Sequence, residues 1–236
     1  MLSRRPLIVF ASAVLLSAVT QSQSNAAFLT EYKGQPFQDT KYNGGPQRIP
    51  GTVMCAYYDL GGEGVAFHDS DAKNNGSGAL NPANGSYLNG FRMNEGVDTS
   101  YTKFGLDPKT DDNQYNKVVP PSGLLYVGWT EPGEWFNLTV DVAGTGDYSF
   151  DLLYTSNRGG AITVDVNGKA ASGPLMIAST YDSAEPVAWR QWHHWNVARG
   201  LGRIHMERGL NVITVRTVSE GQMNYATLQF KRIRPK

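Results

Sequence analysis

The chain consists of short apolar runs separated by polar, glycine-rich stretches. Several runs alternate apolar and polar positions, as from Tyr148 to Tyr154, and period two is typical of a strand with one buried face. No window repeats apolar positions at helical spacing, so the pattern predicts no amphipathic helix. The expected strands are Thr52–Tyr58, Val65–His68, Leu124–Trp129, Trp135–Val142, Tyr148–Tyr154, Ala161–Val166, Leu175–Ile177, Trp192–Val197, Asn211–Val218 and Tyr225–Ile233.

Turn residues between the runs indicate the fold. Asn167-Gly168 lies between two apolar segments, and this pair favours a two-residue type I′ hairpin. Many short strands with Gly-rich turns predict an all-β protein, a single-domain β-sandwich of the jelly-roll type. Residues 69–123 are too long for a plain connection, and long ordered loops are usually functional.

The first residues have the pattern of a secretory signal peptide. Two arginines precede an apolar stretch over 7–19, and small residues Ala26 and Ala27 follow. The apolar stretch is shorter than the roughly 20 residues that a membrane span needs. We therefore expect a signal peptide over 1–27, a linker or N-terminal arm over 28–48, and a β-sandwich over 49–236 in a secreted or periplasmic protein without a membrane span.

Composition excludes several function classes. The chain has 21 Lys and Arg against 21 Asp and Glu, and this balance argues against a nucleic-acid partner. Its one cysteine, Cys55, excludes an intramolecular disulfide framework, and we expect a buried, inert thiol. Nucleophile-elbow and phosphate-binding motifs are absent.

Two groups of residues could bind a metal, and each has a simpler explanation. His193 and His194 are adjacent, so on a strand they point to opposite faces and cannot share an ion. Half-exposed strand histidines are the simpler interpretation. Asp69 and Asp71, with Asn74 and Asn75 nearby, offer oxygen ligands for calcium, but they are equally typical of Asx turns.

Aromatic residues give a stronger indication. Trp189, Trp192 and Trp195 lie within seven residues, among Arg, Gln, His and Asn side chains. Flat rings with planar polar neighbours suit the apolar face and hydroxyls of a sugar. With strand periodicity Trp192 faces away from the other two, so not all three can be core residues and at least one should be free to bind.

Motifs in a consistent order resemble a family 6 carbohydrate-binding module, also similar to family 35. The resemblance covers about Ile49 to Phe230 and rests on Ile49-Pro50-Gly51-Thr52, Tyr58–Asp69, Phe91-Arg92, Glu95–Asp98, Val127-Gly128-Trp129, Gly133–Val140, Val164–Gly168, Trp189–Trp192 and Asn224-Tyr225. It implies a β-jelly roll that binds glycans without cleaving them, often beside glycoside hydrolases.

The resemblance also implies a site at the loop edge of the sandwich. The Tyr-Arg pair of the family corresponds to Phe91-Arg92, so Phe91 forms one wall and Trp189 the other, while Asn224 hydrogen-bonds the sugar. Tyr87 could supply the hydroxyl that Phe91 lacks. Core packing of Phe91 or Trp189, and a turn role for Asn224, are the alternatives.

Two departures from the family matter. The triplet that helps to hold structural calcium reads Met54-Cys55-Ala56 here, so we expect that calcium to be absent and no cofactor to be needed. A long insertion around 74–119 could extend or cover the site.

The resulting hypothesis is a secreted, non-catalytic protein that binds a polysaccharide or oligosaccharide. One alternative is a polysaccharide-active enzyme that uses carboxylates of the insertion region (Asp98, Asp107, Asp111 and Asp112). The other is an envelope adhesion protein with a protein partner.

Overall fold

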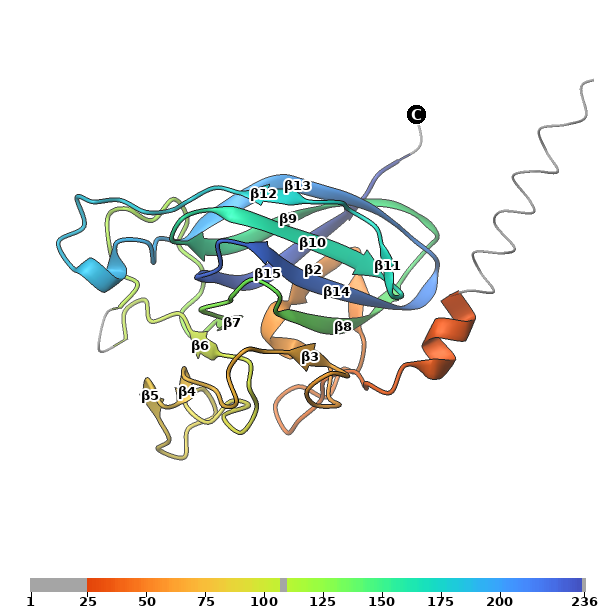
Figure 1. Ribbon diagram of the computed structural model, residues 1–236, viewed down its shortest axis with the longest axis horizontal. Coiled ribbons are helices and arrows are strands. Elements are labelled where there is room, and N and C mark those ends of the chain that lie inside the picture. Colours follow the sequence, from red (N-terminus) through yellow and green to blue (C-terminus); the bar gives the residue numbers. More distant parts are fainter. Residues whose placement is uncertain (1–24, 107–109, 235–236) are drawn as a thin grey trace, which may run out of the picture.

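Two β-sheets lie face to face in the computed structural model, which describes residues 25–106 and 110–234 (Figure 1). The seven-stranded sheet contains, in order, β1 (Gln47–Ile49), β8 (Trp135–Val142), β14 (Gly209–Ser219), β10 (Gly160–Val166) and β11 (Lys169–Ala170), with β3 (Phe67–His68) beside β8 and β12 (Leu175–Ile177) beside β10. The six-stranded sheet contains β13 (Asn196–Met206), β9 (Gly146–Ser156), β15 (Met223–Arg232), β7 (Leu125–Val127) and β6 (Thr99–Tyr101), with β2 (Gly51–Met54) beside β15. The all-β sandwich predicted from the sequence is confirmed.

Alternation along the strands builds the core between the sheets. On β9 the side chains of Tyr148, Phe150 and Leu152 are fully buried. Leu138 on β8 and Ile213 on β14 are buried in the same core cluster from the opposite sheet. Each such side chain contributes about 1.5–3 kcal/mol through burial, so this alternation is what holds the two layers together.

The predicted Asn-Gly hairpin is confirmed. Asn167 and Gly168 both have positive φ, 49° and 72°, and they connect β10 to β11. The Asn167 side chain also accepts a hydrogen bond from the Val212 amide at 2.8 Å, which ties the turn to β14. A type I′ turn requires positive φ at both central residues, and Asn and Gly tolerate it best.

Most predicted strands are present, and the bounds of Trp135–Val142 and Leu175–Ile177 agree with the structure. The first predicted strand ends early, because the chain enters a 3₁₀ helix, η1 (Cys55–Tyr57), after β2. Cys55 is fully buried there, and burial raises the pKa of its thiol, as expected of an inert cysteine.

The predicted strand Trp192–Val197 is wrong. β13 begins at Asn196, and the preceding residues form a turn after the 3₁₀ helix η2 (Ala188–Arg190). The Trp195 amide donates to the Asn116 side chain at 2.7 Å, and the Lys117 amide donates to the Trp195 carbonyl at 2.9 Å. These bonds to the long loop replace the ladder that a strand would form.

The segment expected to be a linker or arm packs against the sandwich. Residues 25–31 are helical, and β1 pairs in parallel with β8. Phe37 between them is only 4% exposed. Most of the predicted signal peptide, residues 1–24, lies outside the described residues, and none of the helices described is long and apolar enough to span a membrane.

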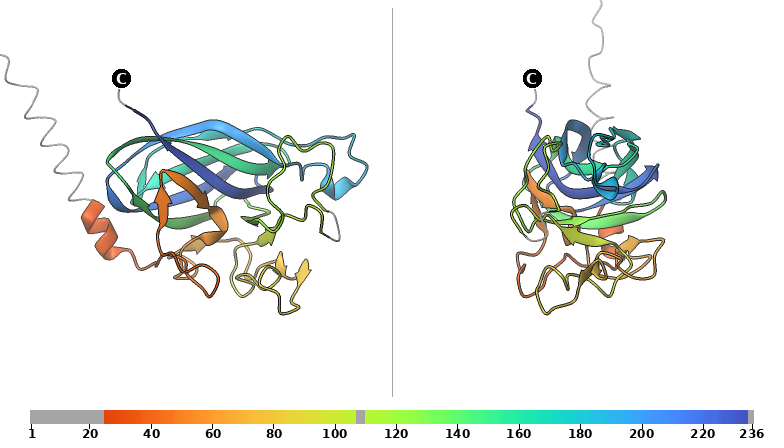
Figure 2. Two further views of the ribbon diagram at one scale, coloured as in Figure 1. Left: turned by 180° about the vertical axis from the view of Figure 1, so that it is seen from behind. Right: turned by 90° about the vertical axis from the view of Figure 1, so that its left-hand side faces the viewer.

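Two long loops lie at one end of the sandwich, opposite the helix at 25–31 (Figure 2). One is formed by residues 69–106 and 110–123, which include the parallel pair β4 (Ser77–Gly78) and β5 (Asn81–Pro82), and the other is residues 178–195 with η2. Asn74 orders the first loop, since its buried Oδ1 accepts amide hydrogen bonds from Gly76, Ser77 and Thr99.

Candidate functional site

A cavity of about 640 Å³ lies between the two long loops. Five aromatic residues line it: Tyr101, Tyr126, Trp129, Trp189 and Trp192. The other lining residues are Leu80, Ser100, Lys103, Thr110, His193 and Gln222. The volume falls in the range of small-molecule sites, which are mostly apolar with a few polar groups.

Trp189 lies in η2 and Trp192 in the turn that directly follows it, and both side chains line the cavity. In 3₁₀ geometry the side chains at i and i+3 lie on the same side, whereas on a strand they would point to opposite faces. Trp189 is 59% exposed, while Trp195 is fully buried. The expectation that Trp192 faces away from Trp189 is therefore wrong, but one tryptophan of the group is indeed open to solvent.

The loop that carries Trp189 is braced from within. The fully buried Glu185 accepts a hydrogen bond from the Arg190 guanidinium at 2.8 Å and one from the Val187 amide at 3.1 Å. The Arg190 bond is the main reason that the pKa of Glu185 is lowered. Arg190 is thus bonded within its own loop, and these bonds order the chain on both sides of Trp189.

Below the cavity a chain of buried polar groups joins distant parts of the sequence. Asp111 is fully buried and accepts hydrogen bonds from the Trp195 indole at 2.6 Å and the Lys103 amide at 2.5 Å. His193 Nε2 lies 2.8 Å from the same carboxylate. Burial would raise the pKa of Asp111, but His193 and the hydrogen bonds lower it below its usual value, so the carboxylate is charged.

Asn224 connects these buried polar groups to Trp129, another residue that lines the cavity. Its amide nitrogen lies 2.8 Å from Thr155 Oγ1 and 3.1 Å from His193 Nδ1, and its oxygen accepts the Trp129 amide at 3.0 Å. Trp129 has a φ of 49°, which is unusual for a bulky residue and is stabilised by that bond. Asn224 is fully buried, so it positions Trp129 and His193 and offers no free group to a sugar.

Phe91 does not form a wall of the cavity, which corrects the sequence-based expectation. It is 3% exposed and packs in a second cluster with Phe37, Tyr57 and Tyr87. The Phe37 ring, from the N-terminal arm, meets Phe91 at 5.6 Å between centroids. The core-packing alternative is the one observed.

Arg92 and Tyr87 belong to the same closed region. The Arg92 guanidinium pairs with Glu95 at 2.8 Å, lies 3.4 Å from the centre of the Tyr58 ring, and donates to the Tyr58 and Asp59 carbonyls. The Tyr87 hydroxyl donates to Asp39 at 2.8 Å. Neither side chain is among those that line the cavity.

The adjacent histidines are buried, at 5% and 2% exposure, and are not half-exposed strand residues as expected. His193 faces Asp111 and His194 Nδ1 lies 2.9 Å from the Thr180 carbonyl oxygen, so the two rings have separate partners. Within residues 25–106 and 110–234, no group of three or more His, Cys, Asp or Glu could hold a metal ion.

Asp69 and Asp71 form Asx-type contacts instead. Asp69 accepts the Asp71 amide at 2.8 Å, and Asp71 accepts the Asn75 side chain at 2.7 Å. Burial, together with the nearby carboxylates of Glu134 and Asp98, raises the pKa of Asp69 to about 7. Burial is also the main reason that the pKa of Asp98 rises to about 6.

The residues at the family's calcium triplet do not fit that ion. Cys55 and Ala56 are fully buried in apolar clusters, and Met54 bonds through its backbone to the Gln47 side chain. None of the three side chains has an oxygen, which calcium requires. Whether the protein needs calcium stays a prediction.

The carboxylates of the enzyme hypothesis are dispersed. Asp111 is enclosed as described, Asp98 accepts the Asn75 amide at 2.5 Å, and Asp112 accepts the Gly105 amide at 3.1 Å. Asp107 lies outside the described residues. No described Asp or Glu is among the residues that line the cavity.

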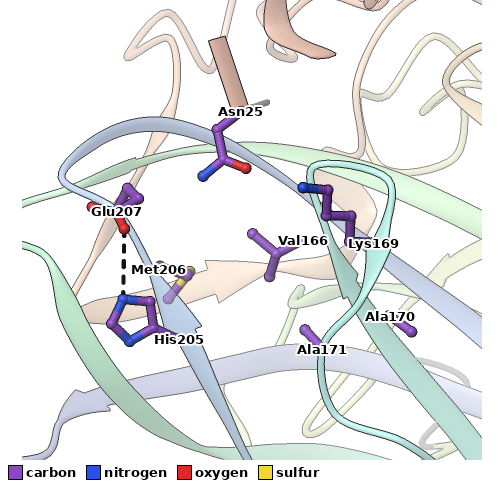
Figure 3. A pocket seen from close by; sticks show the side chains of 8 residues that line it. All are labelled: Asn25, Val166, Lys169, Ala170, Ala171, His205, Met206 and Glu207. Carbon is purple, nitrogen blue, oxygen red and sulfur yellow. Dashed lines mark ion pairs between the residues drawn. The ribbon is translucent and has the colours of Figure 1, made fainter. Parts of the chain in front are cut away.

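A second cavity of about 260 Å³ lies at the opposite end of the sandwich (Figure 3). Its walls include Asn25 at the start of the helix at 25–31, Lys169 on β11, and His205, whose Nε2 lies 3.7 Å from Glu207. Among the described residues that line it, the imidazole of His205 is the only aromatic ring, so this part of the chain offers it no stacking surface like that of the larger cavity.

Sequence reasoning missed most of the cavity. In the sequence Trp129 stands out only as part of a motif of the family resemblance, and no pattern marks Tyr101, Lys103 or Tyr126. Their separation from Trp189 along the chain hides their proximity, and no local pattern marks it. The cluster of three tryptophans was the only available signal.

No protein-family model matches the sequence, and the comparison with curated proteins finds no match. Similar solved structures are carbohydrate-binding modules of families 6 and 35. A β-1,3-glucan-binding family 6 module from Bacillus halodurans has a TM-score of 0.46 at 12% identity, over 79% of this chain and 98% of that one. A family 6 module from Clostridium stercorarium has a TM-score of 0.46 at 10% identity, over 81% of this chain and all (100%) of that one.

A family 35 module from Clostridium thermocellum has a TM-score of 0.38 at 20% identity, over 50% of this chain and 84% of that one. The chain covers only 24% of a Podospora anserina β-1,4-mannanase that carries a family 35 module. At these identities the roles of residues come from this chain's own geometry.

Proposed function

We propose that this protein binds a polysaccharide or oligosaccharide in the aromatic cavity without cleaving it. The observation that carries the proposal is Trp189, a ring held 59% exposed at a cavity lined by four further aromatic side chains. Several aromatic side chains gathered at one cavity are typical of a ligand site, and the flat apolar face of tryptophan suits the C–H face of a sugar ring.

Polar groups around these rings suit sugar hydroxyls. Gln222 is exposed and lines the cavity, and the buried Ser100 is a second polar residue of its lining. A mixture of ring faces with a few amide and hydroxyl groups is the usual composition of a site that binds a neutral, hydroxyl-rich ligand.

A non-catalytic role is supported by the position of the carboxylates. Glycoside hydrolysis uses two carboxyl groups about 5–10 Å apart across the sugar. Asp98, Asp111 and Asp112 each accept a hydrogen bond from a backbone amide, and none of them lines the cavity. Release of reducing ends from polysaccharides by the pure protein would favour the enzyme hypothesis instead.

We also propose that residues 1–27 direct export and that the mature protein acts outside the cytoplasm, beside glycoside hydrolases and without a nucleic-acid partner. The charge and apolar pattern of the first residues supports this. N-terminal sequencing of the exported protein should begin near Ala26 or Ala27, and retention of an intact N-terminus in the cytoplasm would contradict it.

The test is glycan binding by Trp189→Ala. We expect affinity to fall by at least about tenfold, or about 1.4 kcal/mol, because the stacking face is lost. The matched control is Trp135→Ala, since the Trp135 ring faces Arg216 at 5.6 Å and does not line the cavity. Unchanged affinity in Trp189→Ala, or equal losses in both variants, would contradict the site.

A further inference from the structure

One cation lies in the wall of the aromatic cavity. Lys103 follows β6, and among the described lining residues it alone is a Lys, Arg, Asp or Glu. Its ammonium donates to Asn81 Oδ1 at 2.6 Å and lies 5.1 Å from the centre of the Tyr101 ring. These partners are neutral, so they orient the charge without cancelling it.

Asn81 acts as a clamp for this ammonium. It is 3% exposed, and its own amide donates to Ser100 Oγ at 3.0 Å, which fixes the direction of its oxygen. An ammonium has three donors, and a single neutral acceptor leaves capacity for another partner. Lys103 is thus held in position and is not a freely moving surface lysine.

Asp111, the carboxylate whose charge acts on Lys103, does not form an ion pair with the Lys103 ammonium. Asp111 is fully buried, and its oxygens are occupied by the Lys103 amide, the Trp195 indole and His193. Among the described residues, no carboxylate oxygen lies within 4.0 Å of the Lys103 ammonium. Burial lowers the pKa of Lys103, and the charge of Asp111 partly opposes this.

We propose that Lys103 makes the cavity selective for sugars that carry an anionic group, a carboxylate or a sulfate ester. This inference rests on the proposed function, because the anion would be held while the sugar ring stacks on the tryptophans. A charge-assisted bond to a partly desolvated ammonium is stronger than a bond between neutral groups. Both the lysine and its clamp come from the insertion region, so the selectivity belongs to this loop.

The experiment is calorimetric titration of the full chain with two matched pairs of oligosaccharides. The carboxylate pair is homogalacturonan oligosaccharide before and after complete methyl esterification. The sulfate pair is κ-carrageenan oligosaccharide and its desulfated form. The proteins are the wild type, Lys103→Met, Lys103→Arg, Trp189→Ala, and Lys73→Met as the control for an exposed lysine outside the cavity.

We expect the wild type to bind one anionic member at least about tenfold more tightly than its neutral partner, the range of a bond to a charged group. Lys103→Met should lose this preference and keep the neutral affinity, while Lys103→Arg and Lys73→Met should retain it. The pair that shows the preference identifies carboxylate or sulfate. Unchanged melting temperatures would show that each variant is folded.

Equal affinity for the members of both pairs, or a preference that survives Lys103→Met, would overturn this inference. In either case, if the wild type binds the oligosaccharides and Trp189→Ala does not, the proposed function stands. No binding of any member by the wild type would count against the proposed function and would remove this inference with it.

Discussion

Two aromatic clusters, built mostly from loops, differ in whether they are covered. The closed cluster contains Phe37, Tyr42, Tyr57, Tyr87 and Phe91. The open cluster consists of the five aromatic residues that line the cavity, Tyr101, Tyr126, Trp129, Trp189 and Trp192. In the closed cluster Phe37 lies 5.0 Å from Tyr57 and 5.6 Å from Phe91, between ring centroids. In the open cluster Trp189 keeps 59% of its surface exposed.

The difference comes from the N-terminal arm. Phe37 and Tyr42 belong to the segment before β1. Phe37 packs on Phe91, the ring that the family resemblance assigns to a binding site, and Tyr42 packs on Phe37 and Tyr57. Aromatic side chains therefore stabilise the fold in the closed cluster and are available for recognition in the open cluster. Which role they have depends on whether a segment distant in the chain covers their rings.

The largest expected effect tests the closed cluster. Phe91→Ala should lower the free energy of unfolding by about 3–5 kcal/mol, since a buried ring is removed from a packed site. Chemical denaturation measures this loss. Glycan affinity per folded molecule should stay near that of the wild type; a small stability loss with a large affinity loss would instead make Phe91 a binding residue.

The next effect tests the support of the open cluster. Asn224→Ala should cost about 1–3 kcal/mol, because the Trp129 amide loses its buried acceptor. Trp129 should also move, so glycan affinity should fall although Asn224 touches no ligand. The control, Asn84→Ala, changes an exposed loop asparagine and should cost less than about 0.5 kcal/mol. An Asn224→Ala protein with wild-type stability would contradict the role assigned here.

A smaller effect depends on pH and concerns Asp69, which lies near the carboxylates of Asp71, Asp98 and Glu134. The pKa of Asp69 is raised from 3.8 to about 7, so the native state binds a proton more readily than the unfolded chain between these values. Its contribution to stability therefore falls as pH rises through that window. Asp69→Asn should stabilise the protein at pH 8 by about 1 kcal/mol after allowance for solvent screening, and should have no effect near pH 4.

Thermal unfolding at the two pH values measures this difference. Asn retains an oxygen that can accept the Asp71 amide, so the Asx contact survives the change. A loss of stability at pH 8 would mean that the Asp69 charge is compensated by a cation.

The smallest expected effect is that of a chelator. The calcium triplet of the family carries no oxygen side chain here, so EDTA should change neither the melting temperature, within about 1 °C, nor glycan affinity. Glycan binding with and without chelator checks this. A clear loss of either would mean that an ion binds elsewhere, with Asp69 to Asn75 as the first place to look.

Local sequence patterns predicted much of the fold. Trp135–Val142 alternates strongly enough to fix its strand bounds, and Asn167-Gly168 determines its turn because few residue pairs tolerate positive φ twice. Trp192–Val197 was wrongly predicted as a strand, because its backbone bonds to Asn116 and Lys117 far away in the chain. Local propensity contains no information about such partners.

The candidate site was predictable only in part. Trp189 was identified from the density of tryptophans around it, but Phe91 and Asn224 are enclosed by segments distant in the chain. No local pattern marks Lys103, because the role proposed for it depends on Asn81 and on the aromatic rings that line the cavity with it.

The sequence by itself determined an all-β sandwich, its tight turn and the presence of a tryptophan-rich loop, because periodicity, turn chemistry and residue type are local properties. The tertiary structure alone decided which rings are open, which polar groups are satisfied inside, and where a cation faces a cavity. Those properties depend on what covers a residue and what lies opposite it, and both are set by chain segments that packing brings together.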